Sequence, residues 1–167
     1  MSRLLTSRRR RTSSGFTLIE ILVVIGIIAI LAAIVIIAIN PARQFAQARN
    51  SERQSNIEAI LNAIGQRMAD NEGLFNASTT PGCTLTVLPT TATDISTANP
   101  TADLRGCLVP TYMSELPVDP TTGHAWNGSS YDTGYTVMQD STTGRITVAA
   151  PAAASASELS QTISLTR

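Results

Sequence analysis

The chain of 167 residues has few of the side chains that most catalytic and metal sites require. It contains one histidine, His124, and two cysteines, so a metal site built from a histidine cluster is excluded. A serine hydrolase would have to use His124, which lies in a glycine-rich turn without a nucleophile elbow. We therefore expect no catalytic residue, no cofactor and no metal ligand set.

Charged and strongly polar side chains are absent from the run between Ile21 and Ile39. A helix rises about 1.5 Å per residue, so this run is about 28 Å long, close to the roughly 30 Å of a bilayer's hydrocarbon core. The sequence therefore predicts a membrane-spanning helix. Glu20 stands at its start, and because a charge inside a spanning helix is costly, we expect a functional contact with a cationic partner.

Positive charge is concentrated before that run. Five arginines give residues 1–15 a charge of +5, so the remainder, with seven arginines and twelve acids, carries −5. Arginines beside a first apolar helix hold that end in the cytoplasm, which places everything after Ile39 outside. The same arginines could bind nucleic acid, but no aromatic residues are interleaved with them and they adjoin a membrane span. Nucleic acid is therefore not an expected partner of this segment.

Two ordinary kinds of membrane signal explain only some features of the N-terminal segment. A cleaved secretory signal has an apolar core of about 7–15 residues followed by a small-residue cut site and polar sequence, whereas this core continues to Ile39. An uncleaved signal anchor accounts for the length and the orientation. It accounts neither for Glu20 nor for the small residues Ser13-Ser14-Gly15.

The segment Gly15-Phe16-Thr17-Leu18-Ile19-Glu20, with arginines before it and the apolar run after it, resembles the processing signal of type IV prepilins and type II secretion pseudopilins. The resemblance implies cleavage between Gly15 and Phe16 by a prepilin peptidase, followed by methylation of the new Phe16 amine. It also implies that an inner-membrane assembly machinery builds the mature chains into a helical filament. In that filament, Glu20 would meet the Phe16 amine of a neighbouring subunit.

Asn40-Pro41 closes the apolar run, and proline predicts a kink or a local break in the helix. An amphipathic helix then continues to a stop signal at Asp70-Asn71-Glu72-Gly73. Its apolar stripe, which we expect to receive a small globular domain, consists of Phe45, Ala48, Ile57, Ile60, Leu61, Ile64 and Met68. The charged and amide side chains expected elsewhere are Arg49, Glu52, Arg53, Gln54, Glu58 and Arg67. Ala46, Ala59 and Ala63 leave smooth patches suited to neighbouring helices.

From residue 74 onward the chain is rich in Thr, Ser, Gly and Pro, which predicts a loop-rich head. Val109 to Leu116 is expected to form a helical turn, and Ala152 to Ser157 a linker of small residues. Alternating patterns predict strands at Thr84 to Leu88, Tyr135 to Gln139, Arg145 to Ala149 and Thr162 to Thr166, the last three forming a β-meander.

The segment Leu116-Pro117-Val118-Asp119-Pro120 resembles the Leu-Pro-x-Asp-Pro segment that precedes the sheet in many pilin and major-pseudopilin heads. The chain departs from major pseudopilins because it lacks their Trp-Gly after Asp-Pro and their acid-rich, calcium-binding ending. These departures argue against a secretion pseudopilin and against calcium. Asp119, Asp132 and Asp140 could ligate calcium, but without the dense alternation of a calcium loop we expect turn formers with solvated side chains.

Cys83 and Cys107 both lie in the part that the arginines place outside the cytoplasm. A disulfide between them would stabilise the head by about 3 kcal/mol in the chain-entropy picture. Two unpaired thiols remain the alternative, and a metal site would need more ligands than this region offers.

We predict an α+β protein in which a long N-terminal hydrophobic helix packs on a small antiparallel β-sheet head. The expected segments are a basic leader (1–15), a transmembrane and filament-core helix (16–39), its amphipathic continuation (40–73) and the head (74–167). The resemblance implies a structural, non-enzymatic subunit of a homo-oligomeric type IV pilus-like surface filament, used in adhesion, motility or DNA uptake. Before assembly it would be a single-pass inner-membrane protein in contact with lipid. The alternatives are a secretion pseudopilin and a signal-anchored surface protein that forms no filament.

Overall fold

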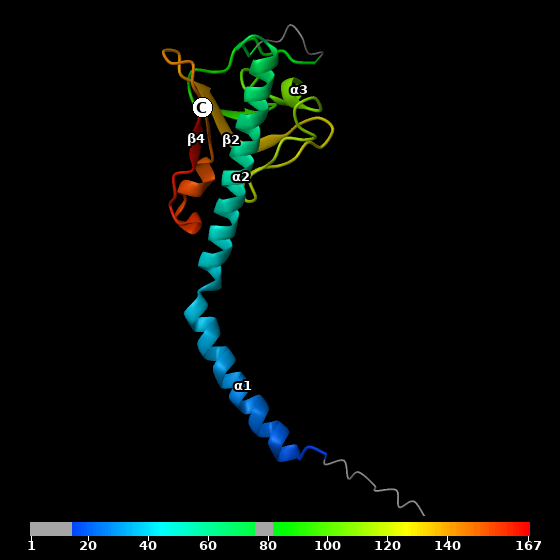
Figure 1. The fold of residues 1–167 in the computed structure, drawn as a ribbon, viewed down its shortest axis with the longest axis vertical. Coiled ribbons are helices and arrows are strands. Elements are labelled where there is room, and N and C mark those ends of the chain that lie inside the picture. Colours follow the sequence, from blue (N-terminus) through cyan, green and yellow to red (C-terminus); the bar gives the residue numbers. More distant parts are fainter. Residues whose placement is uncertain (1–14, 76–81) are drawn as a thin grey trace, which may run out of the picture. The chain divides into compact units, whose positions relative to one another are not determined.

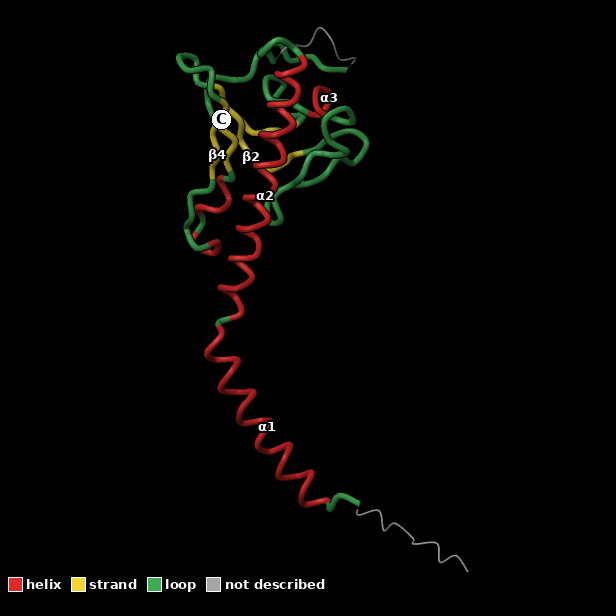
Figure 2. Tube along the Cα trace, viewed as in Figure 1, coloured by secondary structure: helices red, strands yellow, loops and turns green. Residues whose placement is uncertain are grey.

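The computed structural model describes residues 15–75 and 82–167, without the side chains of residues 37–39. The chain divides into two compact units, Met1–Pro41 and Ala42–Arg167. A long apolar helix forms the first, and a second helix with a four-stranded antiparallel sheet forms the core of the other (Figures 1 and 2). The predicted α+β class is confirmed. The predicted basic leader, apart from Gly15, lies outside the described residues.

Helix α1 spans Leu18–Ile39 and consists almost entirely of Ile, Leu, Val and Ala. Every large apolar side chain described between Leu18 and Ile36 is at least half exposed, so the helix buries none of them within its own unit. Among the described residues it is the one helix long and apolar enough to cross a membrane. The predicted long apolar helix is therefore present, and its length and composition are those that a membrane span requires.

The predicted break at Asn40-Pro41 is confirmed. Helix α1 ends at Ile39, Asn40 adopts a left-handed conformation with φ of 46°, and helix α2 begins at Pro41. Proline suits the first position of a helix because its fixed φ is helical and its missing N–H would have had no partner there.

Helix α2 spans Pro41–Asp70 and ends where Glu72 and Gly73 adopt positive φ. The Gly73 N–H donates to the Met68 carbonyl oxygen at 2.8 Å, which closes the last turn. Ile57, Ile60, Leu61 and Ile64 are buried against the head, as the stripe predicted.

Three expectations for α2 are wrong. Phe45 is 65% exposed, whereas the stripe predicted that it would face the head. Arg53 and Arg67 are fully buried, because partners described below neutralise or bind their guanidinium groups inside the head. Ala46 and Ala63 are buried, so of the three alanines predicted to form patches for neighbouring helices only Ala59 is exposed.

The sheet has the order β1-β2-β3-β4, and all its pairs are antiparallel. Its strands are β1 (Thr93–Ser96), β2 (Asp132–Gln139), β3 (Ile146–Ala149) and β4 (Ser164–Thr166). The last three confirm the predicted β-meander. Strand β1 was not predicted, because four residues within a Thr-rich stretch give little alternation to read.

The predicted strand at Thr84 to Leu88 is wrong. Leu85 and Leu88 are buried, so the alternating pattern does mark a segment that packs on the core. However, the segment joins no sheet in the described part of the chain, and it bends at Thr86 and Val87. Strand β1 occupies the position beside β2 instead.

Two further expectations in the head are wrong. The helical turn lies at α3 (Arg105–Leu108) and not at Val109 to Leu116, which follows it as turns. The small-residue stretch is no linker, because it forms two short 3-10 helices, Pro151–Ala154 and Ala156–Glu158. Ala153 of the first is buried in the core, and small side chains allow this close packing.

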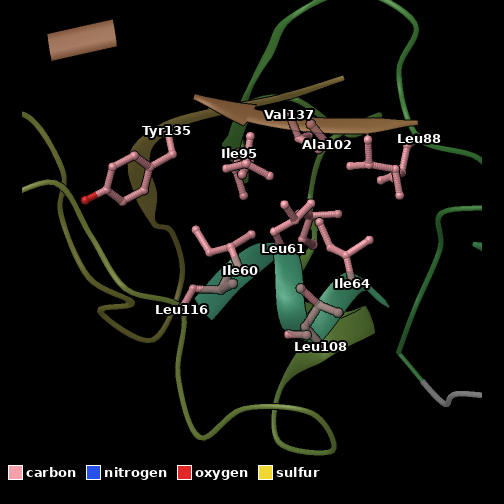
Figure 3. Close-up of a cluster of buried hydrophobic side chains, with 14 of the residues drawn as sticks. Ile60, Leu61, Ile64, Leu88, Ile95, Ala102, Leu108, Leu116, Tyr135 and Val137 are labelled. Atoms are coloured by element: carbon pink, nitrogen blue, oxygen red, sulfur yellow. The ribbon is translucent and has the colours of Figure 1, made fainter. Parts of the chain in front are cut away.

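One hydrophobic core joins α2 to the sheet and to α3. Figure 3 shows the α2 side chains Ile60, Leu61 and Ile64 facing Ile95 and Val137 of the sheet, with Leu108 nearby. All six of these residues are fully buried. The head is thus held on the C-terminal half of α2 by apolar contacts.

Candidate processing and assembly sites

The predicted processing junction lies just before α1. Phe16 is 83% exposed, and a Cβ placed on Gly15 would meet no atom within 4 Å. The chain itself therefore gives no steric reason for glycine at position 15. A requirement for glycine here would have to come from an enzyme that binds this junction.

Glu20 is held by Thr17 in a capping box at the start of α1. One Glu20 carboxylate oxygen accepts hydrogen bonds from the Thr17 N–H at 3.1 Å and from the Thr17 hydroxyl at 3.0 Å. In return, the Thr17 hydroxyl oxygen accepts from the Glu20 N–H at 3.2 Å. The negative carboxylate also lies at the positive end of the helix dipole. In a single chain, Glu20 thus has polar partners without any cation.

The expectation of a cationic partner overlooked this local bond. The signal was in the sequence, because a threonine followed three residues later by a glutamate at the start of an apolar run is the pattern of a capping box. The bond also places the Glu20 carboxylate against the N–H of the residue that follows Phe16. Cleavage before Phe16 would therefore release an amine one residue away from the Thr17 N–H that binds the Glu20 carboxylate.

A buried ion cluster fixes the head to the N-terminal half of α2. Arg53 is fully buried and donates to both carboxylate oxygens of Asp119, at 2.6 and 3.1 Å. The same guanidinium donates to Glu158 at 2.7 Å, to the Asn50 side-chain oxygen at 2.8 Å and to the Thr121 hydroxyl at 2.7 Å. One arginine thus joins the Leu-Pro-Val-Asp-Pro segment and the second 3-10 helix to α2.

Arg49, one turn earlier on α2, completes the cluster. Its guanidinium donates to both carboxylate oxygens of Glu158, the shortest distance being 2.6 Å. Two arginines therefore meet two carboxylates, Asp119 and Glu158, so the cluster carries no net charge. Arg53, Asp119 and Glu158 are buried, whereas the Arg49 side chain is 32% exposed, and charge-assisted hydrogen bonds compensate the burial of the three.

These contacts keep both carboxylates ionised at neutral pH. Burial raises the pKa of Asp119, but bonds from Arg53, Thr121 and Thr122 outweigh burial and bring that pKa well below its ordinary value. Arg49 does most to lower the pKa of Glu158, and Arg53 adds to the effect.

The expected role of Asp119 as a solvated turn former is half wrong. It does accept bonds from the Thr121 and Thr122 N–H groups, as a turn former does, but its side chain is fully buried with Arg53. Asp132 accepts instead from the Gly134 N–H, and Asp140 from Thr142 and Thr143 in the β2–β3 turn. Across residues 15–75 and 82–167, no group of three or more acids, histidines or cysteines is placed to hold a metal ion.

Cys83 and Cys107 are joined by a disulfide that links the segment after α2 to α3. The buried Arg67 of α2 donates to the Cys107 carbonyl oxygen at 2.9 Å and to the Cys83 sulfur at 3.3 Å, and it also lies over the Phe75 ring. Sequence reasoning placed Arg67 on the polar face, because helical spacing says nothing about a carbonyl oxygen supplied by a distant loop.

His124 shows no catalytic arrangement among the described residues. Its backbone forms an isolated antiparallel bridge with Asp132, with N–H to oxygen distances of 2.7 and 3.0 Å, and its side chain is exposed. The histidine thus serves to extend the start of β2.

Residues 10–38 match the family model described as the prokaryotic N-terminal methylation motif. This match confirms the resemblance to the prepilin-type cleavage and methylation signal. It covers the junction, Glu20 and nearly all of α1, and it does not extend into the head. Searches of curated proteins and of solved structures gave no match.

Proposed function

We propose that this chain, which carries a prepilin-type methylation motif, is a structural subunit of a type IV pilus-like surface filament. The observation that carries the proposal is the motif match over residues 10–38, on a helix whose large apolar side chains are at least half exposed. A folded head with its own core follows that helix. A motif for processing, an apolar helix that needs partners and a folded head are the parts that such a subunit requires.

Before assembly, α1 spans the inner membrane, with the arginine-rich leader in the cytoplasm and the head outside. The length and composition of α1 support the span, and the charge asymmetry supports the orientation. A prepilin peptidase then cuts between Gly15 and Phe16, and the new Phe16 amine is methylated. The exposed position of Phe16 is compatible with access to an enzyme at the membrane surface.

On leaving the bilayer, the apolar surface of α1 must be covered by other copies of the same helix. Exposure of that surface to water would be unfavourable by roughly 25 cal/mol for each Å². Packing of this helix from many subunits into a filament core removes this cost. The subunit is therefore expected to exist in the membrane or in the filament, and not as a free soluble chain.

Glu20 determines the register of assembly in this proposal. In the single chain, Thr17 satisfies its carboxylate. In a dry helical core, a carboxylate bonded only to a hydroxyl and an N–H keeps an uncompensated charge, which is costly. The Phe16 amine of a neighbouring subunit supplies the missing positive charge, and only one axial offset between the two helices brings the groups together.

Two other functions share part of this support. A secretion pseudopilin would carry the same motif. Major pseudopilins have a calcium-binding ending, whereas here Asp119 binds Arg53 and the described head has no cluster of three or more acidic, histidine or cysteine side chains. This difference favours a pilus-like subunit. A signal-anchored surface protein would share the apolar helix. It would have no use for a methylation motif.

The test compares host cells with and without the gene. Electron microscopy of surface filaments, with mass spectrometry of sheared material, should show filaments that contain this chain and that disappear on deletion. Secretion of the host's exported proteins should be unchanged by the deletion. Unchanged filaments with a secretion defect would identify a pseudopilin, and a surface protein absent from all sheared filaments would contradict a filament subunit.

A further inference from the structure

Strand β4 is the last strand of the sheet, and in the part of the chain that the structure describes its outer edge has no strand partner. Backbone hydrogen bonds join Arg167 to Ile146 in both directions, at 2.8 and 2.9 Å, and the Ala150 N–H donates to the Ile163 carbonyl oxygen at 2.9 Å. Because an antiparallel strand directs alternate residues to its two sides, the backbone groups of Ser164 and Thr166 point away from β3. These groups form an open edge.

A groove of about 700 Å³ runs beside this edge, between β4 and the middle of α2. Ile57 of α2, which is buried, and the half-buried Ile163 and Leu165 supply its apolar side chains. Ser51 and Gln54 of α2 are exposed on the opposite wall. Glu58 is the one charged residue in the lining, so an uncharged segment could enter without leaving several charges unpaired.

The opposite edge of the sheet is closed. At β1, the Asn99 side chain donates to the Asp94 carbonyl oxygen at 3.0 Å, and the Asn99 N–H donates to the Ser96 carbonyl oxygen at 3.3 Å. An irregular register between Asp94 and Ser96 disrupts this edge further. Covered and irregular edges are how proteins prevent strand addition. In the described residues β4 keeps a regular register, and the one tie at its end is a hydrogen bond from the Arg167 guanidinium to the Asn62 side-chain oxygen of α2.

A matching apolar patch lies elsewhere on the head. Leu74 is 62% exposed and Val87 is 69% exposed, and with Phe45 they are the large apolar side chains that the described residues of the second unit leave exposed. Leu74 and Val87 line the same hollow together with Thr86. We call Leu74, Thr86 and Val87 the apolar patch; it contains no charge.

The apolar patch also carries free backbone groups. No backbone hydrogen bond within the described chain joins Thr86 or Val87 to another segment. Thr86 and Val87 lie at a bend, and Val87, which is β-branched, is 69% exposed, so its side chain and the backbone groups of both residues can reach an open strand edge.

We propose that the groove beside β4 of one subunit receives the apolar patch of a second copy of this chain. Val87 packs on Ile163 and Leu165, and the Thr86–Val87 backbone pairs with the edge groups of Ser164 and Thr166. The inference rests on the proposed function, which brings many copies of the head together. It adds which two surfaces of the heads meet.

The location of the two surfaces favours contact between different copies. The groove lies beside residues 47–58 of α2, whereas the patch follows the end of α2 at Asp70. Along the helix axis, residues 54 and 70 are separated by about 24 Å. Contact between two different surfaces repeats from copy to copy without closing, which is how helical filaments are built.

Cysteine cross-linking in assembled filaments tests the proposal. The two native cysteines form a disulfide, so Val87→Cys with Ser164→Cys in the full chain adds the only thiols. Under mild oxidation, filaments of this double variant should give a ladder of dimers and larger species on a non-reducing gel. Each single variant should remain monomeric. Thr142→Cys with Ser164→Cys is the matched control, because Thr142 is equally exposed but lies in the β2–β3 turn, and it should give no ladder.

Filaments that form but give no ladder would overturn the docking proposal and leave the proposed function intact. A chain that makes no filaments at all would overturn both.

A second pair of variants tests the edge itself, since Ser164→Pro removes an outward N–H and Ser164→Ala keeps it. Proline at an edge position leaves the bonds to β3 in place. Filament yield should drop several-fold for proline only, and Val87→Glu should give the same loss; normal yields in both would refute the contact.

Discussion

At the scale of single residues, Glu20 has Thr17 as its partner in the structure, and the proposed filament would give it a second partner, the Phe16 amine of a neighbour. Thr17 binds its carboxylate in the separate subunit, through one N–H and one hydroxyl. These bonds stabilise the first turn of α1 but supply no positive charge. The capping role and the assembly role can therefore be separated by substitutions that keep the hydrogen bond and remove the charge.

Glu20→Gln and Glu20→Val make this separation. Glutamine keeps a side-chain oxygen that can accept from Thr17, whereas valine keeps neither the oxygen nor the charge. We expect both variants to insert into the membrane and to keep a folded head, and both to lose most filaments, because both lack the charge that pairs with the Phe16 amine. The measurement is sheared filament yield beside total membrane-bound subunit.

The result for glutamine decides between the two roles. Wild-type filament yield for Glu20→Gln, with loss for Glu20→Val, would show that the cap and not the charge governs assembly. Loss of the subunit itself in either variant would instead point to a role in folding or insertion.

Gly15 is expected to matter only to the processing enzyme, because a Cβ at this position would meet no atom of the described residues within 4 Å. Gly15→Val should therefore leave a membrane-embedded precursor that keeps residues 1–15, with an unchanged head. The wild-type protein should begin at a methylated Phe16. Intact-mass measurement of both proteins checks this, and wild-type protein in the membrane that still carries Met1 would contradict processing.

At the scale of elements, the junction between α2 and the head combines the apolar core with a buried ion cluster centred on Arg53. Arg53 bonds with Asp119 and Glu158, which belong to two different segments of the head. Removal of one member of a buried ion cluster leaves the other charges without compensation. The effect should therefore exceed that of any exposed arginine in the chain.

Arg53→Ala should lower the free energy of unfolding by about 3–5 kcal/mol. Arg145→Ala is the matched control, because Arg145 is exposed immediately before β3, and it should change the free energy by less than about 0.5 kcal/mol. Denaturant unfolding of the detergent-solubilised chain can be followed by the fluorescence of Trp126, the single tryptophan, which lies against Arg105 of the head. Equal effects of the two substitutions would contradict the importance of the cluster.

The disulfide links two elements that the core also joins. We expect Cys83 and Cys107 to be bonded in protein taken from the cell surface, because the positive charge of the leader predicts that the head lies outside the cytoplasm. Non-reducing peptide mapping measures this, and free, alkylatable thiols in the native protein would refute it. Cys83→Ser with Cys107→Ser should lower stability by about 3 kcal/mol.

Element boundaries were predictable where a pattern was long or chemically distinctive. The apolar run predicted α1, Asn40-Pro41 predicted its end, and two alternating segments joined by a turn predicted β2 and β3. The prediction of a strand at Thr84 to Leu88 was wrong because the alternating pattern indicates burial of Leu85 and Leu88 and not the presence of a neighbouring strand. Pairing depends on distant segments, which a local pattern does not contain.

The candidate sites also differ in whether a local pattern was enough to predict them. The methylation motif is local, so the sequence was enough to identify it and Glu20 within it. The ion cluster joins α2 to residues 66 and 105 positions further along the chain. Helical spacing placed Arg53 and Arg67 on the solvent face because it does not show which polar groups fold back to meet them.

At the scale of the whole molecule, the chain combines an apolar helix with a head that is held together partly by charge. The head buries two carboxylates, Asp119 and Glu158, together with arginines. The filament proposal exposes this head to the medium outside the cell. Stability of the head in acid is therefore a property of the assembled filament as well as of the single chain.

Stability should fall in acid because the cluster lowers the pKa of both carboxyls in the folded head. The ordinary values, 3.8 for Asp119 and 4.5 for Glu158, describe the unfolded chain. Above those values both states are ionised and the stabilisation is complete. As pH falls below about 4.5, the unfolded chain takes up protons first, so the free energy of unfolding decreases until the folded carboxyls are protonated too.

Unfolding midpoints followed by Trp126 fluorescence should be flat from pH 7 to 5 and decrease below that range. The double variant Arg53→Met with Asp119→Asn removes the central pair and should show a shallower decrease, whereas equal acid sensitivity in the two proteins would place its cause outside the cluster.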